Sequence, residues 1–130
     1  AARRGVSVDV VVPGVNNLKL VDRAMRAQFD QLLKGGCRIW RAGGAFHHSK
    51  LMTIDGAWSY VGSSNLDARS LRLNFEVDLE ILDREIALKV EERIGKVIDS
   101  SREVNLTRLK NRPFYERLID RIIWLGSPYL

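Results

Sequence analysis

A strand, a helix and a second strand follow one another within the first 41 residues, and this order limits the folds open to the chain. Val6 to Val12 reads VSVDVVV and stops at Pro13-Gly14, so it predicts a buried strand followed by a turn. Apolar side chains then recur with the helical period over residues 18–32, and Gly35-Gly36 is typical of a helix end. Residues 37–41 predict the second strand. Such a βαβ unit requires a parallel pair of strands joined by a crossover helix.

A β-hairpin is predicted in the middle of the chain. Residues 47–54 and 57–63 read as two strands joined at Asp55-Gly56, a dipeptide that favours a tight turn between apolar runs. Residues 73–82 alternate in part between apolar and acidic side chains and predict a further strand.

Two helices complete the predicted pattern. Asp83 is a suitable N-cap for the helix that follows it, and Pro113 is typical of the start of a helix over residues 114–125. Strands and helices that alternate in this way favour layered packing. We therefore predict an α/β fold, a mixed β-sheet sandwiched between α-helices, as a single domain over residues 1–130.

Composition excludes several other classes of protein. The chain has 130 residues, of which 45% are hydrophobic and 28% charged, a balance typical of one globular domain and not of a disordered chain. No apolar run approaches the ~20 residues that a transmembrane helix needs. A single cysteine, Cys37, cannot form an intramolecular disulfide. Because the sequence starts without Met or a signal-like stretch, we expect it to be a fragment or a processed product.

Basic residues are distributed unevenly along the chain, whose net charge is +5. Residues 1–41 contain eight basic and three acidic residues, residues 42–101 contain seven and ten, and residues 102–130 contain six and three. A basic surface favours polyanions such as nucleic acid or an anionic lipid leaflet. A solvated basic face without a partner explains the same charge, which therefore does not choose between these readings.

Reactive side chains concentrate between residues 48 and 76. His48 and Lys50 alternate along the predicted strand, so they project from one face. Ser63 and Asn65 share a side if the chain stays extended after the partner strand. An imidazole beside an ammonium, a hydroxyl and an amide offers a nucleophile or proton carrier next to donors for phosphate oxygens. Glu76 has a carboxylate that is able to fix the tautomer of such an imidazole.

Each of these residues also has a structural explanation. A single histidine in a strand is more often structural than catalytic, and a lysine is usually solvated. Asp55 is sufficiently explained as a turn residue, and Ser63 and Asn65 are suited to capping the turn after the strand. Glu76 is equally suited to the exposed side of its strand. Only the joint spacing of these residues favours a function.

That joint spacing resembles the signature of the phospholipase D superfamily, H-x-K-x4-D-x6-G-S-x-N. The longer string SSNLDARSLRLNFEVDLEILD is similar to the bacterial cardiolipin synthase branch, and the similarity extends to VDVVVPG and to the tail RLIDRIIWLGSPYL. The resemblance therefore covers nearly the whole chain and implies the phospholipase D-like fold. The residues that match the signature are His48, Lys50, Asp55, Gly62, Ser63 and Asn65.

The resemblance implies a chemistry that the spacing alone does not show. Family members bring two such motifs together across a pseudo-twofold axis and use no metal or other cofactor. One histidine attacks phosphorus to give a phosphohistidine, and the other protonates the leaving alcohol and then activates the acceptor. For the second motif of such an enzyme this implies a general acid and base at His48, oriented by Glu76, a phosphate site made by Lys50 and Asn65 with support from Ser63, and a loop-holding role within the catalytic set for Asp55.

Only one H-x-K-x4-D segment is present. The neighbouring His47 has no lysine two residues later, and we interpret it as a structural or gating neighbour. Either the first motif lies in a missing N-terminal half, or two copies of the chain pair, as the single-motif nucleases of the superfamily do. The start without Met and the cardiolipin synthase resemblance favour the missing half. The isolated chain is then an incomplete enzyme.

The leading functional hypothesis is phosphatidyl transfer between phospholipids, namely cardiolipin synthesis from phosphatidylglycerol. The motif leaves open whether the acceptor is phosphatidylglycerol, phosphatidylethanolamine or water. The alternatives are a homodimeric phosphodiesterase or nuclease and a non-catalytic interaction domain. Residues around the motif are net negative and lack the interleaved aromatic and basic residues that stack bases, so nucleic acid is not the expected partner. The intact motif argues against a non-catalytic domain.

Basic and apolar residues mix in the segment 108–124. This mixture is consistent with peripheral docking on an anionic membrane surface. The resemblance to bacterial cardiolipin synthases implies that this surface is the cytoplasmic face of the bacterial inner membrane. A helix packed on the core with a solvated charged face is an equal alternative.

Overall fold

The computed structural model describes residues 1–14, 19–44, 48–65 and 74–126. Two compact units make up the chain: the first consists of Ala1–Phe46 and Ser101–Leu130, and the second of His47–Ser100. Each described unit combines a three-stranded sheet with at least one helix, so the predicted α/β class is confirmed. The described strands are divided between a mixed sheet and an antiparallel sheet, whereas the sequence pattern suggested one sheet. A single domain over residues 1–130 stays a prediction.

The first unit contains the predicted βαβ arrangement. β1 (Asp9–Pro13) and β2 (Arg38–Ala42) pair in parallel, and α1 (Lys19–Lys34) lies between them in the sequence. A third strand, β6 (Arg102–Glu103), pairs antiparallel with β2 and makes this sheet mixed. β6 leaves no signal in the sequence pattern, because two residues are too short to show an alternation.

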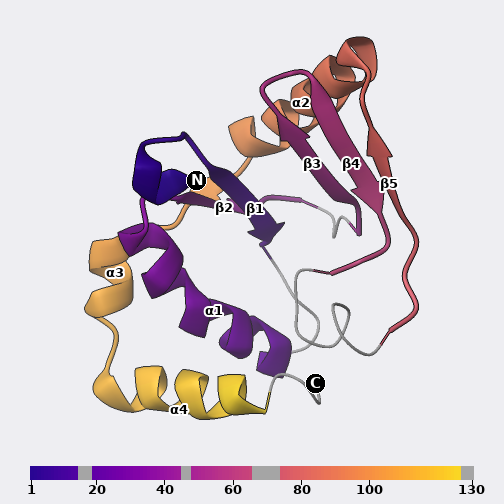
Figure 1. The fold of residues 1–130 in the computed structure, drawn as a ribbon. Helices are drawn as coiled ribbons and strands as arrows, with labels where there is room; N and C mark the ends of the chain where they lie inside the picture. Colours follow the sequence, from indigo (N-terminus) through magenta and orange to yellow (C-terminus); the bar gives the residue numbers. More distant parts are fainter. Residues whose placement is uncertain (15–18, 45–47, 66–73, 127–130) are drawn as a thin grey trace. The chain divides into compact units, whose positions relative to one another are not determined.

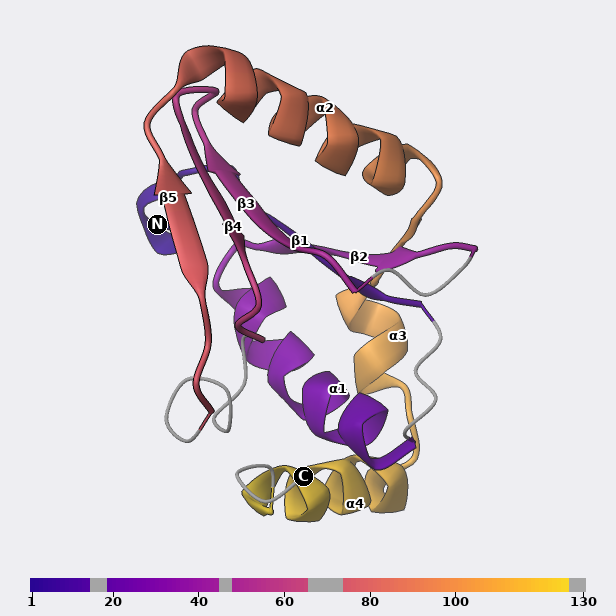
Figure 2. The same cartoon turned by 90° about the vertical axis from the view of Figure 1, so that its right-hand side faces the viewer.

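Helices cover this mixed sheet in layers. In both views α1 lies between the sheet and α4 (Phe114–Leu125), and α3 (Leu106–Lys110) precedes α4 (Figures 1 and 2). Ile39 of β2 is fully buried, as is nearly all of Phe29 of α1, so the core of this unit lies between the sheet and α1. No helix within the described ranges combines the length and the apolarity that crossing a membrane requires.

The second unit is a hairpin sheet covered by one helix. β3 (Lys50–Ile54), β4 (Trp58–Gly62) and β5 (Asp78–Ile81) form an antiparallel sheet, and α2 (Arg84–Asp99) packs against β3 and β4 (Figure 1).

Local interactions fix the start of α2 and the turn between β3 and β4. The side chain of Asp83 accepts a 2.9 Å hydrogen bond from the backbone N–H of Ile86, which confirms the predicted helix cap. Asp55 and Gly56 have φ values of 52° and 59°, and two successive positive φ angles are the signature of a type I′ hairpin turn. The Asp55-Gly56 turn is therefore confirmed.

Candidate active site

Three strands meet in one row of residues at the end of the antiparallel sheet away from the Asp55-Gly56 turn. Lys50, at the start of β3, pairs with Gly62 at the end of β4, and Gly62 pairs with Asp78 at the start of β5. Residues paired in this way are about 5 Å apart and share a face of the sheet. Most of the candidate residues lie on this row or a few positions beyond it, so strand pairing gathers them at one end of the sheet.

The structure brings His48 and Lys50 together. The Nζ atom of Lys50 lies 2.6 Å from Nδ1 of His48 and 3.0 Å from Nε2, and it donates a 2.9 Å hydrogen bond to the His48 carbonyl oxygen. The arrangement therefore places a positively charged group beside an imidazole, the side chain that most often transfers protons in catalysis.

Ser63 and Glu76 form a second pair. The Ser63 hydroxyl donates a 2.6 Å hydrogen bond to Glu76 Oε2 and accepts a 2.9 Å bond from the backbone N–H of Val77. The backbone N–H of Ser63 donates to the Val77 carbonyl oxygen at 3.0 Å, which extends the pairing of β4 with β5 by one residue. Asn74 donates a 3.4 Å bond to the other carboxylate oxygen of Glu76. The hydroxyl of Ser63 and the carboxylate of Glu76 thus hold each other in place.

A carboxylate that the sequence analysis left unassigned holds the chain after β4. Asp78 accepts hydrogen bonds from the hydroxyls of Tyr60, at 2.6 Å, and Ser64, and from the backbone N–H groups of Ser63 and Ser64, each at 3.2 Å. These donors, the Ser64 hydroxyl foremost, hold the pKa of Asp78 below its ordinary value. The hydrogen bond that Tyr60 donates to Asp78 raises the pKa of the Tyr60 hydroxyl. Asp78 therefore fixes the first two residues of the Ser63–Asn65 segment.

The absence of a side chain at Gly62 leaves room for the hydrogen bonds of Asp78. A Cβ atom at this position would overlap Asp78 Oδ1 and would lie 2.7 Å from the Tyr60 hydroxyl oxygen. The glycine of the signature is therefore required by the side chains that cross over it. A glycine inside a strand signals such a close approach, and this was the one clue to Asp78 in the sequence.

The remaining candidate residues lie differently. β3 rises about 14 Å between Lys50 and the Asp55 turn, so Asp55 is at the opposite end of the hairpin from the Lys50 row. Asn65 is exposed and makes no hydrogen bond within the part of the chain that the structure describes. A contact between Glu76 and His48 stays a prediction, and His47 lies outside the described residues.

The groups gathered at this end of the sheet are suited to phosphoester chemistry. The described residues contain no group of three or more His, Cys, Asp or Glu side chains placed to hold a metal ion. They do contain an imidazole against an ammonium, at the end of the sheet where the Ser63 hydroxyl holds Glu76. Such groups suit proton transfer and the stabilisation of charge on phosphoryl oxygens.

Comparison with known proteins agrees with this reading. Residues 1–98 match a protein-family model described as cardiolipin synthase, PLD-like domain. The chain is 40% identical over 134 residues to a cardiolipin synthase A of Pectobacterium carotovorum subsp. carotovorum. It is 39% identical over 130 residues to that of Cronobacter sakazakii and 38% identical to that of Klebsiella pneumoniae. Each alignment covers the whole of this chain and 27% of the relative, in the relative's C-terminal part. The chain therefore spans about a quarter of the relatives' length.

Proposed function

The chain belongs to the phospholipase D-like domain family of cardiolipin synthases, and on this basis we propose that it supplies one of two catalytic motifs for phosphatidyl transfer between phospholipids. The observation that supports this most directly is the contact of Lys50 with the His48 imidazole. It joins a proton-carrying group to a fixed positive charge at the end of the sheet where the phosphate-binding candidates lie.

His48 acts as the general acid and base in this proposal. A histidine of the other motif attacks the phosphorus of one phosphatidylglycerol, so that a P–N bond forms and the P–O bond to glycerol breaks. His48 gives its proton to the departing glycerol oxygen. It then takes the proton from the hydroxyl of a second phosphatidylglycerol, whose oxygen forms the new P–O bond as the P–N bond breaks. The products are cardiolipin and glycerol, and His48 ends protonated as it began.

The neighbours of His48 stabilise charge and hold geometry. Lys50 and Asn65 donate to the non-bridging phosphate oxygens, on which negative charge builds up in the transition state. Ser63 supports this phosphate site, and its hydrogen bond to Glu76 locates the carboxylate proposed to orient the His48 ring. Asp55 acts through the hairpin turn, because its place at the far end of β3 separates it from the Lys50 row.

Phospholipid substrates and an anionic membrane surface are the partners that this activity requires. The segments of the first unit, residues 1–46 and 101–130, together contain 14 basic and six acidic residues, whereas residues 47–100 contain seven and ten. Anionic lipid attracts such a basic unit. We place the protein peripherally at the cytoplasmic face of the bacterial inner membrane, with the first motif in an N-terminal half.

The proposal is tested on the longer parent protein with vesicles rich in phosphatidylglycerol. We expect conversion to cardiolipin with release of glycerol, at a rate that EDTA leaves unchanged. His48→Ala should lower that rate by ~10²–10⁴, the usual contribution of acid–base catalysis. Arg84→Gln, on the exposed surface of α2, is the matched control and should keep the wild-type rate.

Three results would overturn the proposal. Cleavage of DNA by a preparation that leaves phosphatidylglycerol intact would assign the chain to a nuclease. Full transfer activity of the isolated chain, at dilutions where no dimer forms, would show that one motif suffices. Absence of any phosphodiesterase activity in a folded parent protein would indicate the non-catalytic interaction domain.

A further inference from the structure

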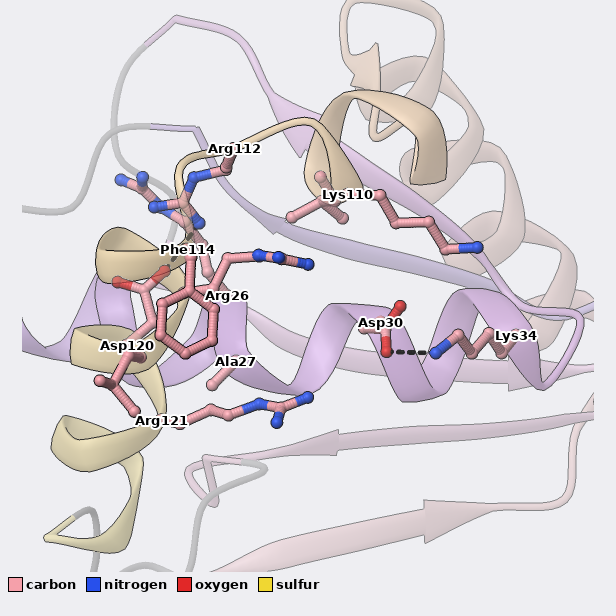
Figure 3. A pocket seen from close by; sticks show the side chains of 12 residues that line it. Arg26, Ala27, Asp30, Lys34, Lys110, Arg112, Phe114, Asp120 and Arg121 are labelled. Atoms are coloured by element: carbon pink, nitrogen blue, oxygen red, sulfur yellow. Dashed lines mark hydrogen bonds and ion pairs between the residues drawn. The ribbon is translucent and has the colours of Figure 1, made fainter.

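A pocket of about 380 Å³ opens between α1, α3 and α4 of the first unit, and its lining includes none of the candidate active-site residues (Figure 3). Its polar lining is dominated by cations. Six basic side chains line it, against only two acidic ones, Asp30 and Asp120. The six are Arg26, Lys34, Lys110, Arg112, Arg117 and Arg121.

Both acidic groups already have basic partners. Asp120 is only 2% exposed and accepts a 2.7 Å hydrogen bond from Arg112, while Asp30 accepts a 2.6 Å bond from Lys34 (Figure 3). Lys110, Arg117 and Arg121 make no ion pair with any residue that the structure describes. The pocket therefore keeps three cations whose charge no described residue neutralises through an ion pair.

Helix geometry directs these cations into one space. Arg117 and Arg121 are four residues apart on α4, so they project from the same side of that helix. In Figure 3 the guanidinium groups of Arg26 and Arg121 extend from α1 and α4 past the ring of Phe114. The Nε atom of Arg26 is buried and has no hydrogen-bond partner among the described residues. Because the guanidinium of Arg26 already pairs with Asp22, the cations left to bind an anion are Lys110, Arg117 and Arg121.

Apolar surface lies directly beside the charges. Phe114 is 71% exposed and lines the pocket, together with the exposed Leu118. The same helix continues with exposed Ile122 and Leu125. A free inorganic anion has no apolar part to contact these side chains, whereas a phospholipid has glycerol and acyl carbons next to its phosphate.

We propose that this pocket binds the phosphate of an anionic phospholipid headgroup, with Phe114 and Leu118 against its glycerol and acyl carbons. The site takes no part in transfer. This proposal rests on the proposed membrane association and identifies the site at which the first unit binds the lipid.

Binding is tested on the full chain by sedimentation with vesicles of 30% phosphatidylglycerol in phosphatidylcholine, and with vesicles of phosphatidylcholine alone. The triple variant Lys110→Gln, Arg117→Gln, Arg121→Gln empties the pocket of its unpaired cations. The matched control Arg84→Gln, Arg93→Gln, Arg108→Gln removes the same charge from exposed positions outside the pocket. Each basic residue near an anionic surface contributes roughly fivefold in affinity, so we expect the pocket variant to lose at least tenfold more than the control.

Soluble ligands separate pocket binding from adsorption to a surface. Dihexanoyl phosphatidylglycerol, below its micelle concentration, should bind the wild-type chain and the control variant but not the pocket variant. Equal losses in the two triple variants would overturn the proposal, and so would binding of inorganic phosphate that matches binding of the short-chain lipid. Because no transfer activity is measured, failure here leaves the catalytic proposal standing, and failure of transfer leaves this site standing.

Discussion

The Tyr60 hydroxyl donates a 2.6 Å hydrogen bond to the Asp78 carboxylate across the position where Gly62 has no side chain. Asp78 also accepts hydrogen bonds from the backbone of the two residues after Gly62, so one carboxylate ties the start of the Ser63–Asn65 segment to β5. The order of the candidate phosphate site therefore depends on a residue that touches no proposed substrate atom.

Replacing Gly62 with alanine should destabilise the chain. The added Cβ would overlap Asp78 Oδ1 and force the carboxylate and the Tyr60 ring to move. Overpacking of this kind costs about 1–3 kcal/mol of unfolding free energy, measured from the midpoint of urea unfolding. Gly95→Ala is the control: it lies within α2 with no atom within 4 Å of the added Cβ, and it should stabilise by about 1 kcal/mol. Equal effects of the two variants would contradict the role given to Gly62.

The Asp78 carboxylate should make stability depend on pH. Its pKa is lower in the folded chain than in the unfolded chain, where it is about 3.9, so protonation favours unfolding. The contribution is fully present above the unfolded pKa and is lost as the pH falls through the folded pKa. Asp78→Asn should therefore lose less stability than the wild type between pH 6 and pH 3 in chemical unfolding. Glu80→Gln, on the same strand and without a hydrogen bond to any described residue, should retain the wild-type profile.

Asp55 should be replaceable by asparagine. Its φ of 52° belongs to the left-handed region, which asparagine and aspartate enter more easily than other residues with a side chain. If Asp55 acts only through the turn, Asp55→Asn keeps both the urea midpoint and the transfer rate of the parent enzyme. Asp55→Val should lower the midpoint, because a β-branched residue is strained at this φ. A large loss of rate in a stable Asp55→Asn enzyme would assign the carboxylate a direct role.

Ser63 and Glu76 should act as one unit. Their 2.6 Å hydrogen bond predicts that Ser63→Ala and Glu76→Gln each lower the transfer rate of the parent enzyme by roughly 10–100-fold, the usual effect of losing a group that positions a reacting residue. The double variant should lose little more than either single one. Strictly multiplicative losses would show that the two side chains work independently. Ser100→Ala, at the end of α2, serves as the control.

The sequence by itself determined the local elements of this protein. The β-branched run, the helical period and the glycines after it predicted β1, α1 and β2, and the Asp55-Gly56 dipeptide predicted the hairpin turn. These features depend on side-chain periodicity and on bonds between near neighbours in the chain, which a sequence shows directly. The signature residues from His48 to Asn65 were visible for the same reason, because their spacing follows one hairpin.

Tertiary structure alone decided which distant residues meet. It divided the described strands between two sheets and paired the two-residue β6 with β2. It placed Asp78 over Gly62, and it put Arg26 of α1 and Arg121 of α4 around one pocket. Such contacts depend on strand register and helix packing, which are set by the whole folded core and leave no period or short motif in the sequence.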